Sequence, residues 1–118
     1  MANEVKELSF NLAVRIVKLC KYLNEEKKEY ILSKQLLKSG TSIGANIREA
    51  INGESKLDFI HKLGIAQKEC DETLYWLELL SATDIINQKE FDSIYPDIER
   101  ILKLLRSIII STKNNLKK

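Results

Sequence analysis

The sequence predicts an all-α protein, folded as an antiparallel up-down-up-down four-helix bundle. Apolar residues recur at steps of three and four along four separate segments, which is the period of an amphipathic helix. The 118 residues include one proline and four glycines, so little of the chain is suited to turns. Connections of about 2 to 6 residues join the four segments, and connections that short place neighbouring helices antiparallel.

The first helix is expected to begin at Asn3, acting as its N-cap, and to end in the polar cluster 24–28. The second is expected to run from Glu29 or Tyr30 to the pair Asn52-Gly53, because glycine commonly follows a helix end. The apolar positions of the first helix are Val5, Leu8, Leu12, Ile16, Leu19 and Leu23, and those of the second are Leu32, Leu36, Gly40, Ile43, Ile47 and Ala50.

The third helix is expected to begin at Gly53 or Ser55 and to end between residues 82 and 86. Its apolar positions are Phe59, Leu63, Ala66, Cys70, Thr73, Leu77 and Leu80. Asn87 and Glu90 have the spacing of a capping box and predict the start of the fourth helix. Pro96 lies inside this last pattern, so a kink or a short break is expected at residues 92–95.

Composition and length place the chain among globular proteins. Apolar residues make up 44% and charged residues 31%, which is far from the composition of disordered chains. At this length residues 1–118 are expected to form one domain. The chain has no apolar run of membrane-spanning length, and the opening M-A-N-E-V-K-E-L has acids where a signal peptide has bases. We therefore expect a cytoplasmic protein without a membrane partner.

Charge is distributed unevenly along the chain. The formal net charge is +2, yet residues 1–50 carry +3, residues 51–100 carry −6 and residues 101–118 carry +5. The bases of the final segment are Lys103, Arg106, Lys113, Lys117 and Lys118. Bases at the end of a helix complement its dipole, which accounts for much of this pattern. If the protein binds RNA, we expect the contact at these five residues.

The residues of enzyme and metal sites are few. His61 is the single histidine, with Asp58 one turn before it, whereas a di-iron bundle needs two carboxylate and histidine pairs. No nucleophile turn or phosphate loop accompanies it. Cys20 and Cys70 lie fifty positions apart within apolar patterns, and we interpret them as buried free thiols. We expect no catalytic residues, no metal, no cofactor and no small-molecule substrate.

The run S-G-T-S-I-G-A-N-I-R-E-A, residues 39–50, consists almost wholly of small residues. Ile43 and Ile47 share its apolar side, and Ser42, Asn46 and Glu49 form a polar strip beside them. Glycine costs about 1 kcal/mol in a helix interior relative to alanine, and Gly40 and Gly44 lie four residues apart. We therefore expect another helix to approach closely here.

Arg48 and Glu49 beside this strip, with Glu72 on the third helix, are the polar groups that we expect to matter most. We interpret them as an interhelical network that fixes register, or alternatively as the lining of a cleft or of a subunit interface. Trp76 is expected to close the core edge or a subunit interface, or to anchor a partner together with Tyr75.

An excess of apolar helix surface suggests self-association. Ile108, Ile109 and Ile110 are consecutive, so they cannot all face one core. Trp76 and Leu79 widen the apolar arc of the third helix beyond its main stripe. We therefore expect part of this surface to lie in a subunit interface.

The small-residue run is followed by two further segments, E-S-K-L-D-F-I-H-K-L-G-I-A and K-E-C-D-E-T-L-Y-W-L-E-L-L. Together the three segments resemble the bacterial four-helix bundle family of 23S rRNA intervening-sequence proteins. The resemblance extends from about Phe10 to Thr112. The positions that match the family motif are Ser42, Ile43, Asn46, Ile47, Glu49, Phe59, Leu63, Ile65, Ala66 and Glu72. Ala50 replaces the usual glycine.

The resemblance implies a ring-like homo-oligomer, a homopentamer in members of known architecture. Some members are encoded inside insertions of large-subunit rRNA genes. A related, basic branch accompanies diversity-generating retroelements and looks like a nucleic-acid-binding accessory to a reverse transcriptase. No catalytic activity is attached to the family. Two functions remain: an oligomeric accessory that binds RNA, or a protein-interaction scaffold whose partner recognises an apolar or acidic face.

Overall fold

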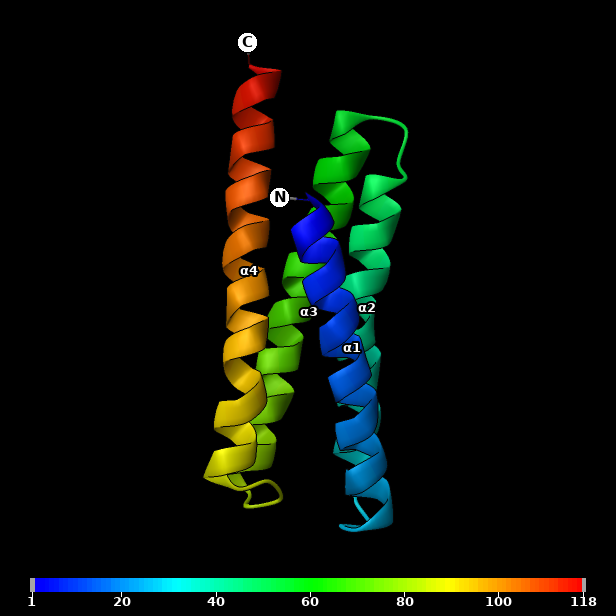
Figure 1. Cartoon of the computed structure of the whole chain (residues 1–118), viewed down its shortest axis with the longest axis vertical. Helices are drawn as coiled ribbons and strands as arrows, with labels where there is room; N and C mark the ends of the chain where they lie inside the picture. The colour runs from blue at the N-terminus through cyan, green and yellow to red at the C-terminus, as the bar shows by residue number, and fades with distance from the viewer. Residues whose placement is uncertain (1, 118) are drawn as a thin grey trace.

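The computed structural model describes residues 2–117, which form four antiparallel helices (Figure 1). These are α1 (Ala2–Glu25), α2 (Ile31–Ile51), α3 (Lys56–Ala82) and α4 (Gln88–Leu116). The bundle measures 52 × 21 × 19 Å, and the end of α4 extends beyond the start of α1 (Figure 1). The predicted all-α, up-down-up-down bundle is confirmed.

Side-chain caps set the start of two helices. The Ser55 hydroxyl accepts a hydrogen bond from the Asp58 N–H at 3.0 Å, which begins α3 at the second of the two predicted positions. Asn87 and Glu90 form the predicted capping box, with both hydrogen bonds at 2.8 Å. The prediction for Asn3 is wrong, because α1 already includes Ala2. The free N–H groups of an exposed helix start can bond to water, so this start needs no side-chain cap.

Helix α4 continues through Pro96, so the predicted short break is not present. Pro96 removes the donor for the carbonyl of Asp92, and Asp92 is exposed, where water can replace that donor. The rings of Phe91 and Tyr95 stack across this turn with centroids 4.4 Å apart. Arg15 of α1 also donates to the carbonyl of Ser93 at 3.0 Å. These contacts hold the turn before the proline in helical geometry.

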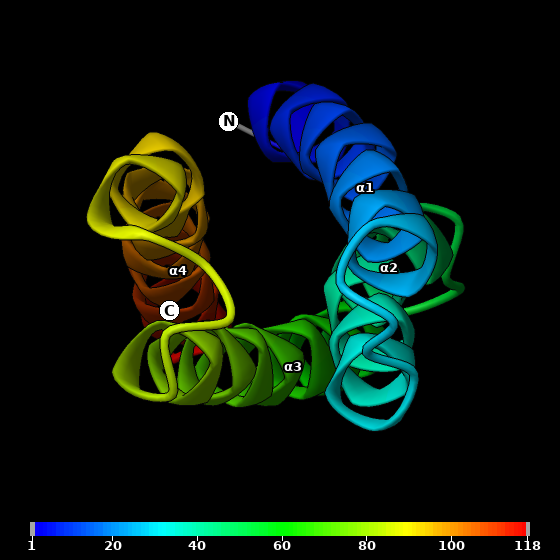
Figure 2. The same ribbon diagram turned by 90° about the horizontal axis from the view of Figure 1, so that it is seen from below.

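The helices surround one core in the order α1, α2, α3, α4 (Figure 2). Each helix contacts its two neighbours, the helices on the diagonals make no close backbone contact, and α1 and α4 approach each other least. The largest fully buried side chains are Leu12, Ile16, Leu23, Leu36, Ile43, Ile47, Leu63, Leu77, Leu80, Ile86, Ile98 and Ile101. Each predicted apolar stripe therefore supplies the core.

The close helix approach predicted at the small-residue run occurs against α1. A Cβ atom at Gly40 would lie 2.8 Å from Cγ2 of Ile16, and one at Gly44 would lie 3.3 Å from Oγ of Ser9. Only glycine at position 40 permits this separation without a shift of the fully buried Ile16. The two glycines therefore lower the helix propensity of α2 but allow α2 to pack close to α1.

Two further predictions concern side chains at the core. Cys20 and Cys70 are buried free thiols, as expected, and burial raises their pKa to about 11 and about 12, with Asp71 and Glu69 adding to the rise at Cys70. Ile108 and Ile109 are buried while Ile110 is exposed, so the three consecutive isoleucines do divide between core and surface. Within residues 2–117 no helix has the length and apolar character needed to span a membrane.

Candidate functional sites

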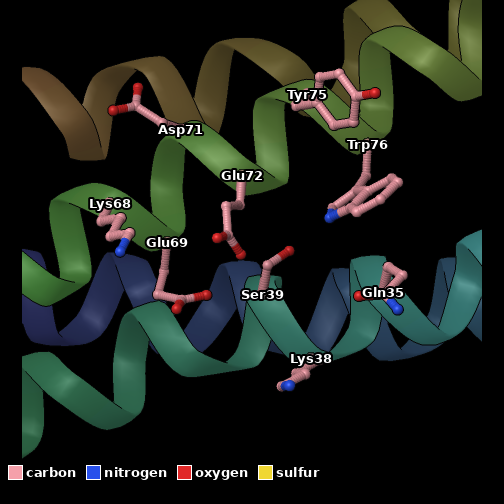
Figure 3. Close-up of a pocket in the computed structure, with 9 residues that line it drawn as sticks. All are labelled: Gln35, Lys38, Ser39, Lys68, Glu69, Asp71, Glu72, Tyr75 and Trp76. Carbon is pink, nitrogen blue, oxygen red and sulfur yellow. The ribbon is translucent and has the colours of Figure 1, made fainter.

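A groove of about 650 Å³ lies on the outer side of α2 and α3, and we call it the α2–α3 groove (Figure 3). Its lining residues are Gln35, Lys38 and Ser39 from α2, and Lys68, Glu69, Asp71, Glu72, Tyr75 and Trp76 from α3. Beneath it the hydroxyls of Ser39 and Thr73 form a buried interhelical hydrogen bond of 3.0 Å. This bond is not predicted from the sequence, where its only signal is a polar residue at a core-facing position on each helix.

Carboxylates outnumber cations in the α2–α3 groove by three to two. Those of Glu69 and Glu72 point toward α2, whereas Asp71 points away (Figure 3). Burial raises the pKa of Glu69, and the negative charge of Glu72 adds to the rise, while Lys38 and Lys68 oppose it. Within residues 2–117 neither Glu69 nor Glu72 has a cationic nitrogen within 4.0 Å. The groove therefore has an excess of acid that no cation among the described residues neutralises by direct contact.

Trp76 lies at the boundary between this groove and the core. It packs against the buried cluster on one side and lines the groove on the other. Its ring is in T-shaped contact with Tyr75, with centroids 4.9 Å apart and planes at 72°. The expected place at the core edge is thus observed.

The structure does not bring Arg48, Glu49 and Glu72 into one network. Glu49 forms an ion pair with Lys62 of α3 at 3.6 Å, which is an interhelical contact. Arg48 and Glu49 both line a groove between α1 and α2, whereas Glu72 lines the α2–α3 groove. Glu72 lies ten residues beyond Lys62 on α3, about 15 Å away at 1.5 Å per residue. Only Glu49 therefore makes the predicted kind of contact.

The polar residues of the small-residue strip bond to their own helix. The Ser42 hydroxyl donates to the carbonyl of Lys38 at 2.7 Å, and the Asn46 amide donates to the carbonyl of Ser42 at 2.8 Å. Both side chains are half-buried. Ser42 and Asn46 thus present a low surface on the α3 side of α2, and Glu49 is the one longer side chain of the strip.

A second groove, of about 330 Å³, lies between α1 and α2. Its lining residues are Lys6, Phe10, Ala13, Thr41, Gly44, Ala45, Arg48 and Glu49. Phe10 is 56% exposed, and Val14 and Val17 are 39% and 37% exposed. We call these three residues the α1 ridge. The α1 ridge is not among the surfaces predicted from the sequence, although the spacing of four and three between its residues is a signal for it.

The basic residues of α4 share one face. Lys103, Arg106, Lys113 and Lys117 are exposed, and with the exposed Ile110 they follow steps of three and four. We call the four cations the α4 basic stripe. Among residues 2–117 none of them has a carboxylate within 4.0 Å. Lys118, the fifth predicted residue, lies outside the described residues.

His61 is exposed on α3, and Asp58 lies in the first turn of that helix. Across the described residues, no three or more His, Cys, Asp and Glu side chains are arranged as a metal site.

Comparisons with known proteins agree with this architecture. The model of the 23S rRNA-intervening sequence protein family matches residues 1–107. A crystal structure from Bacteroides thetaiotaomicron, described as a protein of unknown function from the S23 ribosomal protein family, is 56% identical with a TM-score of 0.90. The similarity covers 92% of this chain and 96% of that one. A search of the curated proteins finds no match. The chain therefore belongs to the 23S rRNA-intervening sequence protein family.

Proposed function

We propose that this protein is a non-enzymatic, homo-oligomeric RNA-binding accessory of the bacterial cytoplasm, assembled as the homopentamer that its family resemblance implies. The α4 basic stripe carries the proposal. It places four exposed cations on one helix face, and no carboxylate of the described chain neutralises them within 4.0 Å. Phosphate contacts by such cations supply most of the affinity of sequence-independent nucleic-acid binding.

The dimensions of the stripe suit an RNA backbone. Lys103 and Lys117 are fourteen residues apart, which is about 21 Å along a helix axis. Four cations over that length can contact up to about four phosphates in each protomer. A homo-oligomer repeats the stripe, so several weak contacts combine into one stronger interaction. This repetition offsets the modest charge of a single chain.

The expected binding is strongly salt-dependent and weakly sequence-dependent. Four phosphate contacts predict that log K falls with log salt at a slope of about −3 to −4. Electrophoretic shifts with a structured RNA should therefore be clearest at about 50 mM salt and should fade toward physiological salt. Absence of any shift at about 50 mM salt would remove RNA binding from the proposal.

A matched pair of triple variants tests the location of the contact. Replacing Arg106, Lys113 and Lys117 with Gln should weaken binding about tenfold or more and flatten the salt slope by about two to three units. The control replaces Lys27, Lys34 and Lys89, exposed lysines at the opposite end of the bundle (Figure 1), and changes the charge equally. Equal weakening by both variants would mean that net charge, rather than the stripe, carries the affinity.

The alternative function is a protein-interaction scaffold with no nucleic-acid role. The acid excess of the α2–α3 groove supports it, because a basic partner segment is complementary to such a surface. Pull-down of the native protein with and without nuclease separates the two functions. A partner that remains after nuclease treatment favours the scaffold, and a partner that is lost favours RNA.

A further inference from the structure

The α1 ridge is an apolar helix face that residues 2–117 leave partly exposed. Phe10, Val14 and Val17 lie at steps of four and three and point away from the core. Lys6 is one turn before Phe10, and Lys21 is one turn after Val17, and both lysines are exposed. An apolar stripe with cations at its two ends is typical of a helix that packs against a second surface.

The α2–α3 groove has the complementary character. Its walls include the indole of Trp76 and the carboxylates of Glu69 and Glu72, which point toward α2 (Figure 3). On the α2 side of the groove the short side chain of Ser39 leaves space for an incoming helix, and Ser42 next to it is equally short. Its three carboxylates against two lysines attract cations such as those at the ends of the α1 ridge.

The ridge and the groove overlap in height along the bundle. Gly44 is opposite Ser9, and Gly40 is opposite Ile16, so residues 9–16 of α1 are level with residues 40–44 of α2. Ser39, next to Gly40, bonds to Thr73 at the middle of the groove, so the Val17 end of the ridge is level with the groove. Rotation about an axis parallel to the bundle can therefore bring this end of the ridge of one copy to the groove of the next.

The two surfaces lie on adjacent sides of the bundle. The ridge belongs to the α1–α2 side and the groove to the α2–α3 side, so α2 forms the corner between them (Figure 2). Unlike patches that meet head to tail form a heterologous interface, and adjacent contact sides turn each successive copy in the same direction. Such an interface closes into a ring when the rotation between successive copies divides a full turn. Helix α4 lies across from α2, so its basic stripe stays outside both contacts (Figure 2).

We propose that the α1 ridge of one copy seats in the α2–α3 groove of the next copy and that this contact builds the ring. This inference rests on the proposed function in one respect, that the protein forms a homo-oligomer. The new part is the identity of the two contact surfaces, their head-to-tail pairing, and the prediction that α4 stays accessible in the oligomer.

Two double variants break one surface each. Phe10→Glu with Val17→Glu places charge on the ridge and leaves the groove intact. Gln35→Arg with Glu72→Arg fills the groove and reverses its charge, and leaves the ridge intact. All four positions are exposed, so the fold should persist, and circular dichroism checks it. Leu57→Glu is the matched control, because Leu57 is 71% exposed and lies outside both surfaces.

Light scattering should give an oligomer for the wild type and for Leu57→Glu, and a 13.6 kDa monomer for each double variant. An equimolar mixture of the two double variants should form a heterodimer and nothing larger, because it contains one intact ridge and one intact groove. Trp76 is the single tryptophan and lines the groove, so its emission in the ridge variant should shift to shorter wavelength when the groove variant is added.

Three outcomes would overturn the interface. The first is a ridge variant that keeps the wild-type mass. The second is a groove variant that keeps the wild-type mass, which is the result expected if ridges contact ridges. The third is a mixture of the two variants that stays monomeric. A monomeric wild type would overturn self-association as well. RNA binding is measured separately. If the wild type and the variants have the expected masses but no RNA is bound, the proposed RNA function is overturned and the ring is not.

Discussion

Helix α1 packs against its two neighbours in two different ways. Against α2 the backbones approach so closely that a Cβ at Gly40 would overlap the fully buried Ile16. Against α4 the helices make fewer close contacts, and polar groups bridge the surface of this edge: Arg15 pairs with Asp97 and donates to the Ser93 hydroxyl at 2.7 Å. Arg100 and Glu4 form a second exposed pair at 3.3 Å.

Because of this difference, we expect the α1–α2 contact to contribute more to stability than the α1–α4 contact. Close apolar packing is not screened by salt, and any added volume disturbs it. Exposed ion pairs contribute about 0 to 1 kcal/mol each and are screened by salt. We therefore expect the α1–α2 contact to hold the fold together and the α1–α4 edge to open first. Substitutions at each contact test this comparison.

Gly40→Leu should have the largest effect. The new side chain must displace Ile16, and we expect the free energy of unfolding to fall by about 3 kcal/mol, the upper part of the usual range for overpacking. Urea unfolding with an unchanged m-value measures it. Gly64→Ala is the control, because no atom lies within 4 Å of its added Cβ, and it should raise stability by up to about 1 kcal/mol. Equal stability of Gly40→Leu and wild type would show that α1 does not pack closely here.

Gly44→Leu should have a smaller effect of the same sign. The nearest atom to a Cβ at this position is Oγ of Ser9 at 3.3 Å, and this hydroxyl also donates to the carbonyl of Lys6. Overpacking costs about 1 to 3 kcal/mol, while the gain in helix propensity is about 0.8 kcal/mol. A net loss of about 1 kcal/mol should lower the melting temperature. A higher melting temperature would mean that the leucine points into solvent.

Much of this contrast could be predicted from the sequence, but only on the α1–α2 side. Glycines four apart in a helix require a reason, and close approach is the usual one. The pairing of Arg15 with Asp97 has no sequence signal, because exposed charges at any spacing can meet across two helices. Periodicity identifies which residues face the core; it does not reveal which exposed side chains lie opposite one another.

The same limit applies to the candidate sites. The α4 bases were visible as an acid-free run, and their common face follows from helical spacing. The α1 ridge was missed because Phe10, Val14 and Val17 lie beside a complete core stripe and were not needed to fill it. The predicted network of Arg48, Glu49 and Glu72 is not formed, because Arg48 and Glu49 line the α1–α2 groove whereas Glu72 lines the α2–α3 groove.

The α1–α4 edge should respond weakly to substitution. A double-mutant cycle of Arg15→Ala and Asp97→Ala should give a coupling free energy below about 1 kcal/mol, because the two side chains are 39% and 49% exposed and water screens the pair. The coupling should nearly vanish at about 1 M salt, where the Debye length is about 3 Å. A coupling of several kcal/mol that is independent of salt would contradict the contrast between the two contacts.

The contact between α3 and α4 supplies the smallest expected effect, and it appears only at high pH. The Tyr95 hydroxyl donates to the Glu78 carboxylate at 2.6 Å, and this bond, with a smaller contribution from burial, raises the pKa of Tyr95 from 10.0 to about 12. A raised pKa means that the folded state holds the phenolic proton more tightly. Its stabilisation, below about 1 kcal/mol for this partly exposed group, is therefore complete below pH 10.0 and is lost as pH rises toward 12. Tyrosinate absorbance should show a late transition that disappears in Tyr95→Phe and moves to lower pH in Glu78→Gln. An unchanged transition in Glu78→Gln would show that Glu78 does not cause the shift.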